Sequence, residues 1–254
     1  MSSSWDLAVA HPVPAGLAGP SLPGWLPGRL RGGLHGGLHG PPRFDLAVLW
    51  SAVAAGPDGT SPGGTRGSLS PDEAARLQAL ITLAQRGDAE AFGQLYERYV
   101  EVVYRYIFVR VGQVHTAQDL TSDTFVKALR NIGTFTWQGK DIAAWFVTIA
   151  RNVVNDHTKS AKFRMEVTTA DMLDADQQVD APEGEVLDRI RDERLLEAVK
   201  ALKPEQAECV VLRFIDGLSI AETAVILGKK ENAVKQLQLR AVRSLQRALE
   251  GETL

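Results

Sequence analysis

The chain has 254 residues, of which 44% are hydrophobic and 23% charged, with a formal net charge of −3, and this length suits one large domain or two small ones. No apolar run approaches the roughly 20 residues that a membrane-spanning helix needs, and the prolines and missing basic start of the N-terminus argue against a secretory signal. The single cysteine, Cys209, excludes an internal disulfide and a multi-cysteine zinc site, so we expect a cytoplasmic protein.

Residues 1–70 differ in composition from the rest of the chain. They hold 14 of the 23 glycines and nine of the 12 prolines, and they include the low-complexity stretch GRLRGGLHGGLHGPP. Such a segment buries too little apolar surface to offset its chain entropy, so we predict a disordered extension with one candidate short helix at 46–53. It could be a removable pro-segment, a tether for a partner or a stretch upstream of the true start. His35 and His39 could bind a metal only loosely, and we expect no cofactor.

From residue 71 onward the hydrophobic pattern is helical. Ser70 can cap a helix that has Pro71 at its first position, and Thr116 and Asp119 have the spacing of a capping box. No strand-like alternation occurs, so the fold class is all-α. The predicted helices span 72–86, 88–111, 116–130, 141–160, 185–202, 204–215, 219–227 and 231–250.

The charge is distributed unevenly along this helical part. Residues 166–184 carry six acids and no Lys or Arg, whereas residues 229–247 carry six Lys or Arg and one acid. We therefore predict two small helical domains, at 71–165 and 185–254, joined by a flexible acidic linker. Because nucleic-acid affinity depends on local patches, the slightly acidic total does not exclude DNA binding.

The second domain has the pattern of a helix-turn-helix. Ser219 and Glu222 form another capping box, and Gly228 suits the left-handed position that ends a helix. The next helix has an apolar stripe, formed by Val234, Leu237, Ala241, Leu245 and Leu249. Its start and outer face would enter the major groove, and the alternative is a solvated helix that packs only on its neighbours. The candidate DNA contacts are Lys229, Lys230, Asn232, Lys235, Gln236, Arg240 and Arg243.

Residues 145–156, WFVTIARNVVND, form a second amphipathic helix, with Arg151 and Asn155 on a polar face that suits contact with a polyanion. The preceding loop, 131–140, carries Phe135 and Trp137, whose rings could stack on unpaired bases or could fill the core beneath the loop. For three other residues we expect structural roles. Trp145 and Cys209 should be core residues and Asp156 an ion-pair partner.

The order of these features resembles the bacterial sigma-70 family, specifically its extracytoplasmic-function group. The matching blocks are AQRGDAEAFGQLYERY at 84–99, AQDLTSDTFVKA at 117–128 and WFVTIARNVVND at 145–156, similar to region 2, and LKPEQAECVVLRFIDGLSIAETA at 202–224, similar to region 4. The resemblance implies a protein that binds core RNA polymerase, recognises the −35 and −10 elements of promoter DNA and helps to open the duplex, without catalysis of its own.

The resemblance also implies roles for individual residues. Asp119 and Asp123, one helical turn apart, would contact core polymerase, although Asp119 could simply be a capping-box acid. The basic face of the last helix would bind the −35 element, and the linker 166–184 would thread into polymerase or act as a spacer. The candidates for the −10 element are Phe135, Trp137, Lys140, Arg151, Asn155, Lys159, Lys162 and Arg164.

Two features depart from the family pattern. Family members often carry arginine at the positions of Leu237 and Val242, and the glycine- and proline-rich extension is unusual for such a compact group. An inhibitory partner, an anti-sigma factor, is an expectation from the group. The main alternative is an operator-binding regulator, which would have no need of an exposed aromatic loop within residues 117–156. An enzyme ranks third, because no catalytic constellation is visible.

Overall fold

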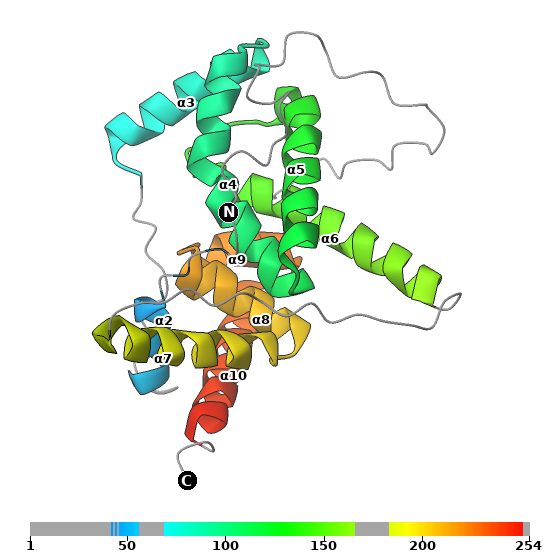
Figure 1. Cartoon of the computed structure of the whole chain (residues 1–254). Helices are drawn as coiled ribbons and strands as arrows, with labels where there is room; N and C mark the ends of the chain where they lie inside the picture. Colours follow the sequence, from blue (N-terminus) through cyan, green and yellow to red (C-terminus); the bar gives the residue numbers. More distant parts are fainter. Residues whose placement is uncertain (1–41, 43, 45, 56–68, 166–182, 251–254) are drawn as a thin grey trace.

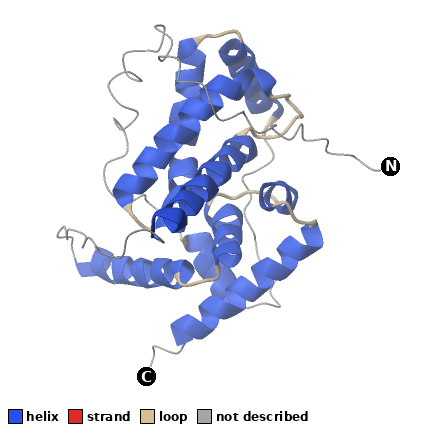
Figure 2. Ribbon diagram, turned by 90° about the vertical axis from the view of Figure 1, so that its right-hand side faces the viewer, coloured by secondary structure: helices blue, strands red, loops and turns tan. Residues whose placement is uncertain are grey.

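The structure, a computed structural model, describes residues 42, 44, 46–55, 69–165 and 183–250. Over these residues every regular element is helical (Figure 2), which confirms the predicted all-α class. The predicted acidic linker and most of the predicted extension lie outside the described residues. The elements are α2 (Ala47–Ala55), α3 (Pro71–Gln85), α4 (Ala89–Val111), α5 (Val114–Asn131), the 3₁₀ turn η1 (Ile132–Thr134), α6 (Ala143–Met165), α7 (Glu183–Lys200), α8 (Pro204–Val210), the π-helical turn η2 (Val211–Ile215), α9 (Ile220–Leu227) and α10 (Glu231–Glu250).

Two of the predicted helix starts are fixed by reciprocal capping boxes. The Ser70 hydroxyl accepts from the amide of Glu73 at 3.2 Å, and the Glu73 carboxylate accepts from the Ser70 amide at 3.0 Å. Ser219 and Glu222 make the same pair of bonds at the start of α9. Gly228, at φ +64°, ends that helix in the left-handed conformation. The local sequence signals at these three points are confirmed.

The predicted capping box at Thr116 and Asp119 is wrong. The helix α5 begins at Val114, with Gln113 in the N-cap position, so Thr116 already lies in the first turn. Its hydroxyl donates to the side-chain oxygen of Gln113 at 3.0 Å instead of capping the backbone. The half-buried Val114 packs against the core and extends the helix toward its N-terminus. Asp119 is therefore no capping acid.

The helices form two packed groups (Figure 1). In the first helical domain, α3 to α6, the central helix α4 contacts α3, α5 and α6. Its core contains aromatic rings packed at tilted angles, with Phe146 of α6 lying 5.3 Å from Tyr99 and 5.2 Å from Phe125 between ring centroids. In the second helical domain, α7 to α10, the long helix α10 contacts α7, α8 and α9.

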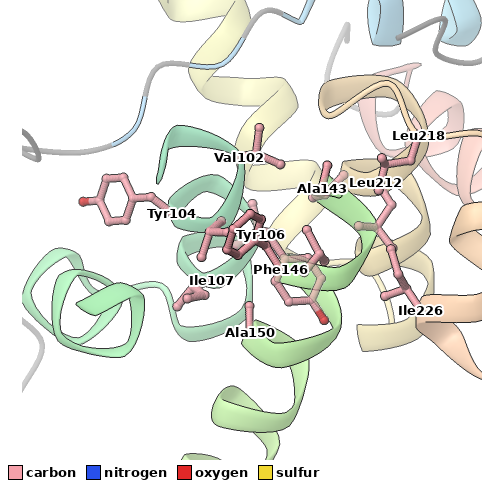
Figure 3. Packing of buried hydrophobic residues seen from close by; sticks show 14 of the residues in the cluster. Val102, Tyr104, Tyr106, Ile107, Ala143, Phe146, Ala150, Leu212, Leu218 and Ile226 are labelled. Carbon is pink, nitrogen blue, oxygen red and sulfur yellow. The ribbon is translucent and has the colours of Figure 1, made fainter. Parts of the chain in front are cut away.

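The two helical domains pack against each other. Helix α4 contacts α8, and α6 contacts α9. Figure 3 shows the apolar side chains of this junction, with Tyr106 and Phe146 of the first domain in the same packed cluster as Leu212 and Ile226 of the second. The apolar core is therefore continuous across both domains, an arrangement that the sequence pattern did not predict.

Within the N-terminal extension, the short helix expected at 46–53 forms as α2. It lies against α10 and the turn η2 of the second domain. Leu46 and Leu49 are buried there, so this part of the extension belongs to the packed core.

Candidate nucleic-acid and polymerase interfaces

The loop between α5 and α6 is held at its start by a side chain of α3. The amide nitrogen Nε2 of Gln85 donates to the carbonyl oxygens of Ile132 at 3.0 Å and Phe135 at 2.7 Å. A single amide group therefore satisfies two acceptors of an irregular segment. Beyond this point Trp137 is half-buried and Lys140 is exposed. Gln85 was not predicted from the sequence, because an amide in an amphipathic helix forms no motif.

The aromatic residues around this loop are engaged to different degrees. Phe135 lies edge-on to Trp145 with 5.5 Å between the ring centroids, and Trp145 lies edge-on to Phe146 at 5.3 Å. Trp145, predicted to be a core residue, is half-buried and packs against the core through these contacts. Trp137 also packs against the core, but its ring makes no contact with the ring of any aromatic residue that the structure describes.

The polar face of α6 is engaged by side chains of both domains. The guanidinium Nε of Arg151 lies 3.5 Å from Oε2 of Glu208 in α8. The side-chain oxygen of Asn155 accepts from Nη2 of Arg110 in α4 at 3.3 Å. In this arrangement, both predicted DNA contacts are occupied by protein groups. Contact of Arg151 with a promoter requires it to leave Glu208 of the second domain, whereas contact of Asn155 requires it to leave Arg110 within its own domain.

Farther along α6 the polar side chains are not engaged in this way. Lys159 and Asp156 are exposed. Asp156 forms no ion pair with any residue in the described part of the chain, and its ion-pair role stays a prediction. The side chains of Lys162 and Arg164 lie outside the described residues, and their roles stay predictions.

Buried ion pairs join the two domains. Glu208 is 2% exposed and pairs with both Arg110 and Arg151. Nearby, Nε of Arg105 lies 3.2 Å from Oδ1 of the buried Asp216. A buried carboxylate is tolerated only when cations and hydrogen-bond donors offset its lost hydration. The roles of these carboxylates could not be predicted from the sequence, because their partners lie far away in the chain and follow no local spacing.

A buried arginine ties the turn η2 to the helix-turn-helix. Arg213 donates through Nη1 to the carbonyl of Leu218 and through Nε to the side-chain oxygen of Gln238 at 3.1 Å. Burial lowers the pKa of Arg213 from its usual value. These bonds fix the angle between α10 and the segment that leads into α9. Gln238 is consequently a structural residue of α10.

The outer face of α10 presents most of the predicted DNA contacts to solvent. The exposed side chains are Lys230, Asn232, Lys235, Gln236, Arg240 and Arg243. Lys229 is half-buried, and its Nζ lies 2.9 Å from Oε1 of Glu205. The opposite face carries the predicted apolar stripe, in which Val234, Ala241 and Leu245 are fully buried.

The two positions that depart from the family pattern lie in different surroundings. Leu237 is half-buried and, together with Lys203 and Arg240, lines a hollow of about 360 Å³. Val242 is buried at 3% exposure. The missing arginine at 242 therefore reflects packing on that face of α10.

Helix α5 presents an acidic pair. Asp119 and Asp123 are both exposed, and their spacing places them one turn apart on the same side of the helix. The neighbouring positions Leu120, Thr124 and Phe125 are buried. The pair forms part of an outward surface that would suit a basic partner.

Three further features of the described part of the chain concern metal binding, the cysteine thiol and membrane-spanning helices. There, no group of three or more His, Cys, Asp or Glu side chains is arranged to hold a metal ion, and His35 and His39 lie outside it. Cys209 is a buried core residue, as predicted, and burial raises the pKa of its thiol to about 12. None of the described helices has the length and apolar character to cross a membrane.

Comparison with known proteins decides the family. The model of Sigma-70 region 2 matches residues 95–164, and that of Sigma-70 region 4 matches residues 192–245. The ECF RNA polymerase sigma factor BldN of Streptomyces coelicolor is 57% identical over 177 residues, which cover 70% of this chain and 67% of BldN. This chain belongs to the sigma-70 family.

Further relatives place this sigma factor in the extracytoplasmic-function group. The ECF sigma factor SigL of Mycobacterium tuberculosis is 28% identical over 173 residues, 68% of this chain and 96% of SigL. The fold is shared with the sigma factor RpoE, solved in complex with the anti-sigma factor NepR from Bartonella quintana, at 21% identity, a TM-score of 0.52 and coverage of 63% of this chain and 98% of RpoE.

The protein is thus a promoter-specific RNA polymerase sigma factor, and domains of its two matched types bind core polymerase and promoter DNA. This family assignment takes the place of the operator-binding regulator that we considered as the alternative. The region 2 match covers most of α4, then α5, the loop and α6, and the region 4 match covers most of α7 to α10. The helices α2 and α3, with Gln85, precede both matches.

Proposed function

We propose that this sigma factor reads its promoter at two points and binds polymerase at a third. The first domain contacts the −10 element through the loop 131–140 and helix α6. The second domain contacts the −35 element through the outer face of α10. The acidic pair Asp119 and Asp123 on α5 contacts a basic surface of core polymerase.

The observation that carries this proposal is the division of α10 into two faces. One face is buried in the second domain, and the other exposes Lys230, Lys235, Arg240 and Arg243 together with two amide side chains. In a helix-turn-helix, the second helix enters the major groove, where lysines, arginines and amides bind phosphates and base edges. Lys229, held by Glu205, is better suited to orient the turn or to reach a phosphate after exchanging its partner.

Opening of the duplex is assigned to the first domain. A protein that binds an unstacked base needs an aromatic ring on which the base can stack and a backbone that holds this ring in place. Trp137 supplies the ring, and the hydrogen bonds from Gln85 hold the backbone at the start of the loop. Phe135 contributes from a half-buried position against Trp145. Lys140, Arg151, Asn155, Lys159, Lys162 and Arg164 would bind the backbone of the opened region.

We further propose that the protein has no catalytic activity, acts in the cytoplasm and is restrained by an anti-sigma factor. The last point is supported by RpoE, which is solved with such a partner. Co-purification from the cells that make the protein tests the partner, and cell fractionation tests the compartment.

The proposed function is tested by run-off transcription with purified core polymerase, followed by mapping of the start sites. We expect transcripts that begin at defined positions and that require both the chain and core polymerase, with no RNA made by the chain alone. If the chain neither bound core polymerase nor directed start-site selection, the proposal would be wrong.

A further inference from the structure

The short helix α2 is docked on the second domain as a ligand would be. Its sequence AVLWSAVAA has no charged residue, and Leu49 and Ala52 are fully buried. A helix of nine residues is barely stable by itself in water. Its helical form therefore depends on the surface that it covers, which belongs to α10 and η2.

Two specific hydrogen bonds anchor this helix. Nε2 of Gln246 in α10 donates to the carbonyl oxygen of Val53 at 2.7 Å, satisfying one of the acceptors that a helix leaves open at its C-terminus. The indole Nε1 of Trp50 donates to Oδ1 of Asp192 in α7 at 3.1 Å. The two bonds reach two different helices of the second domain, so they fix both the position and the direction of α2.

The side of α10 that carries Gln246 is also apolar and buried. Val242 lies one helical turn before Gln246, so both occupy the same side of α10. Val242 is 3% exposed and belongs to the same apolar cluster as Leu49 and Ala52 of α2. The docked helix therefore shares the continuous core of the second domain.

The same segment also reaches the first domain. Just before α2, the ring of Phe44 lies 6.3 Å from that of Phe108 in α4. Phe108 is in turn covered by Nζ of Lys200 in α7, 5.2 Å from the ring centroid. Phe44 and α2 thus contact both domains close to their junction, and they leave the exposed, basic face of α10 uncovered.

We propose that Phe44 and residues 46–55 form an intramolecular clasp, in which α2 is the ligand of an apolar site on α10 and η2. The clasp holds the second domain against the first, in the arrangement where Glu208 engages Arg151. Release of α2 favours separation of the domains and so increases promoter opening. This last step rests on the proposed DNA-binding role of the α6 polar face, whereas the docking itself does not.

A matched pair of full-length variants tests the docking. Leu49→Asp places a charge on the buried face of α2, and Ser51→Asp places the same charge on its exposed face. Hydrogen exchange measured by mass spectrometry reports the helix directly. We expect amides of 47–55 to exchange at least about tenfold faster in Leu49→Asp than in the parent, because an undocked helix of this length unfolds. Ser51→Asp should match the parent, and unchanged exchange in Leu49→Asp would overturn the clasp.

Run-off transcription with core polymerase tests the consequence. At equal concentration, Leu49→Asp should yield several-fold more open complex than the parent or Ser51→Asp, and a peptide of residues 42–55 added to Leu49→Asp should reverse the gain. If Leu49→Asp exchanged faster than the parent but formed no more open complex, the docking of α2 would stand and its regulatory role would be overturned. If no form of the chain directed transcription, the proposed function would fail, and the exchange measurement would still decide the docking.

Discussion

Of the two aromatic residues in the α5–α6 loop, Phe135 is engaged by the ring of Trp145, whereas Trp137 contacts no described aromatic ring. We expect Trp137→Ala to reduce duplex opening by about five- to 150-fold, the equivalent of about 1–3 kcal/mol for one stacked base. Binding to closed promoter DNA should change much less. Permanganate footprinting and filter binding measure the two steps, and Trp137→Phe, which keeps an aromatic face, is the control. Equal loss in both steps would make Trp137 a structural residue.

Cys209 links burial to the pH dependence of stability. Burial raises the pKa of its thiol from 9.0 to about 12. A raised pKa in the folded state means that the stabilisation is fully present below pH 9 and is lost as the pH rises from about 9 to about 12. Tyr106, whose pKa burial raises from 10.0 to about 12, acts in the same direction.

We therefore expect the melting temperature to fall between pH 8 and pH 10.5, and to fall less in Cys209→Ala. Iodoacetamide should modify Cys209 at pH 8 in denaturant at least about 100-fold faster than in the folded protein. Rapid modification of the folded chain would show that the thiol is accessible.

At the level of elements, α3 supports the loop through a single side chain. Gln85→Ala removes two hydrogen bonds to loop carbonyls, each worth about 0.5–1.5 kcal/mol. We expect a small loss of stability and a larger loss of promoter opening, because the loop loses its fixed start. Gln78→Ala, at an exposed position of the same helix, should leave both unchanged. Equal effects of the two variants on opening would exclude a positioning role for Gln85.

The basic side chains on the exposed face of α10 predict that the affinity for DNA depends on salt concentration. Each phosphate contact contributes about 0.9 to the slope of log K against log salt concentration. Lys235→Ala should therefore lower that slope for promoter DNA by up to about one unit. Arg194→Ala, exposed on α7, is expected to leave the slope as in the parent. An unchanged slope in Lys235→Ala would remove this lysine from the set of phosphate contacts.

For the whole molecule, the decisive contact is Glu208 between the two domains. Glu208→Gln keeps the shape of the side chain but removes the charge that Arg110 and Arg151 share. We expect a larger radius of gyration in X-ray scattering and faster hydrogen exchange across α8, because two arginines lose their buried counter-charge. Glu197→Gln is the control, since its pair with Lys200 is exposed and should contribute little. Unchanged scattering in Glu208→Gln would show that apolar packing alone holds the domains together.

The sequence by itself determined the features that depend on residues one or two turns apart. Helical periodicity, the capping boxes at Ser70 and Ser219 and the glycine turn at Gly228 all arise within a short stretch of chain. The sequence blocks that resemble the sigma-70 family could be recognised for the same reason. At Thr116 the capping-box spacing predicted a helix start that the structure does not have. The helix begins earlier, at Val114, because burying this apolar side chain outweighed an exposed cap.

Only the tertiary structure decided which polar residues are engaged and by what. Arg151 was predicted to face DNA from its position on an amphipathic helix, yet its partner Glu208 lies 57 residues away. Gln85 and the loop are 47 and 50 residues apart, and α10 binds Val53 across 193 residues. Pairings at such separations follow no sequence period. They depend on which helix faces meet when the apolar core closes, and that core is shared by both domains and by the clasp.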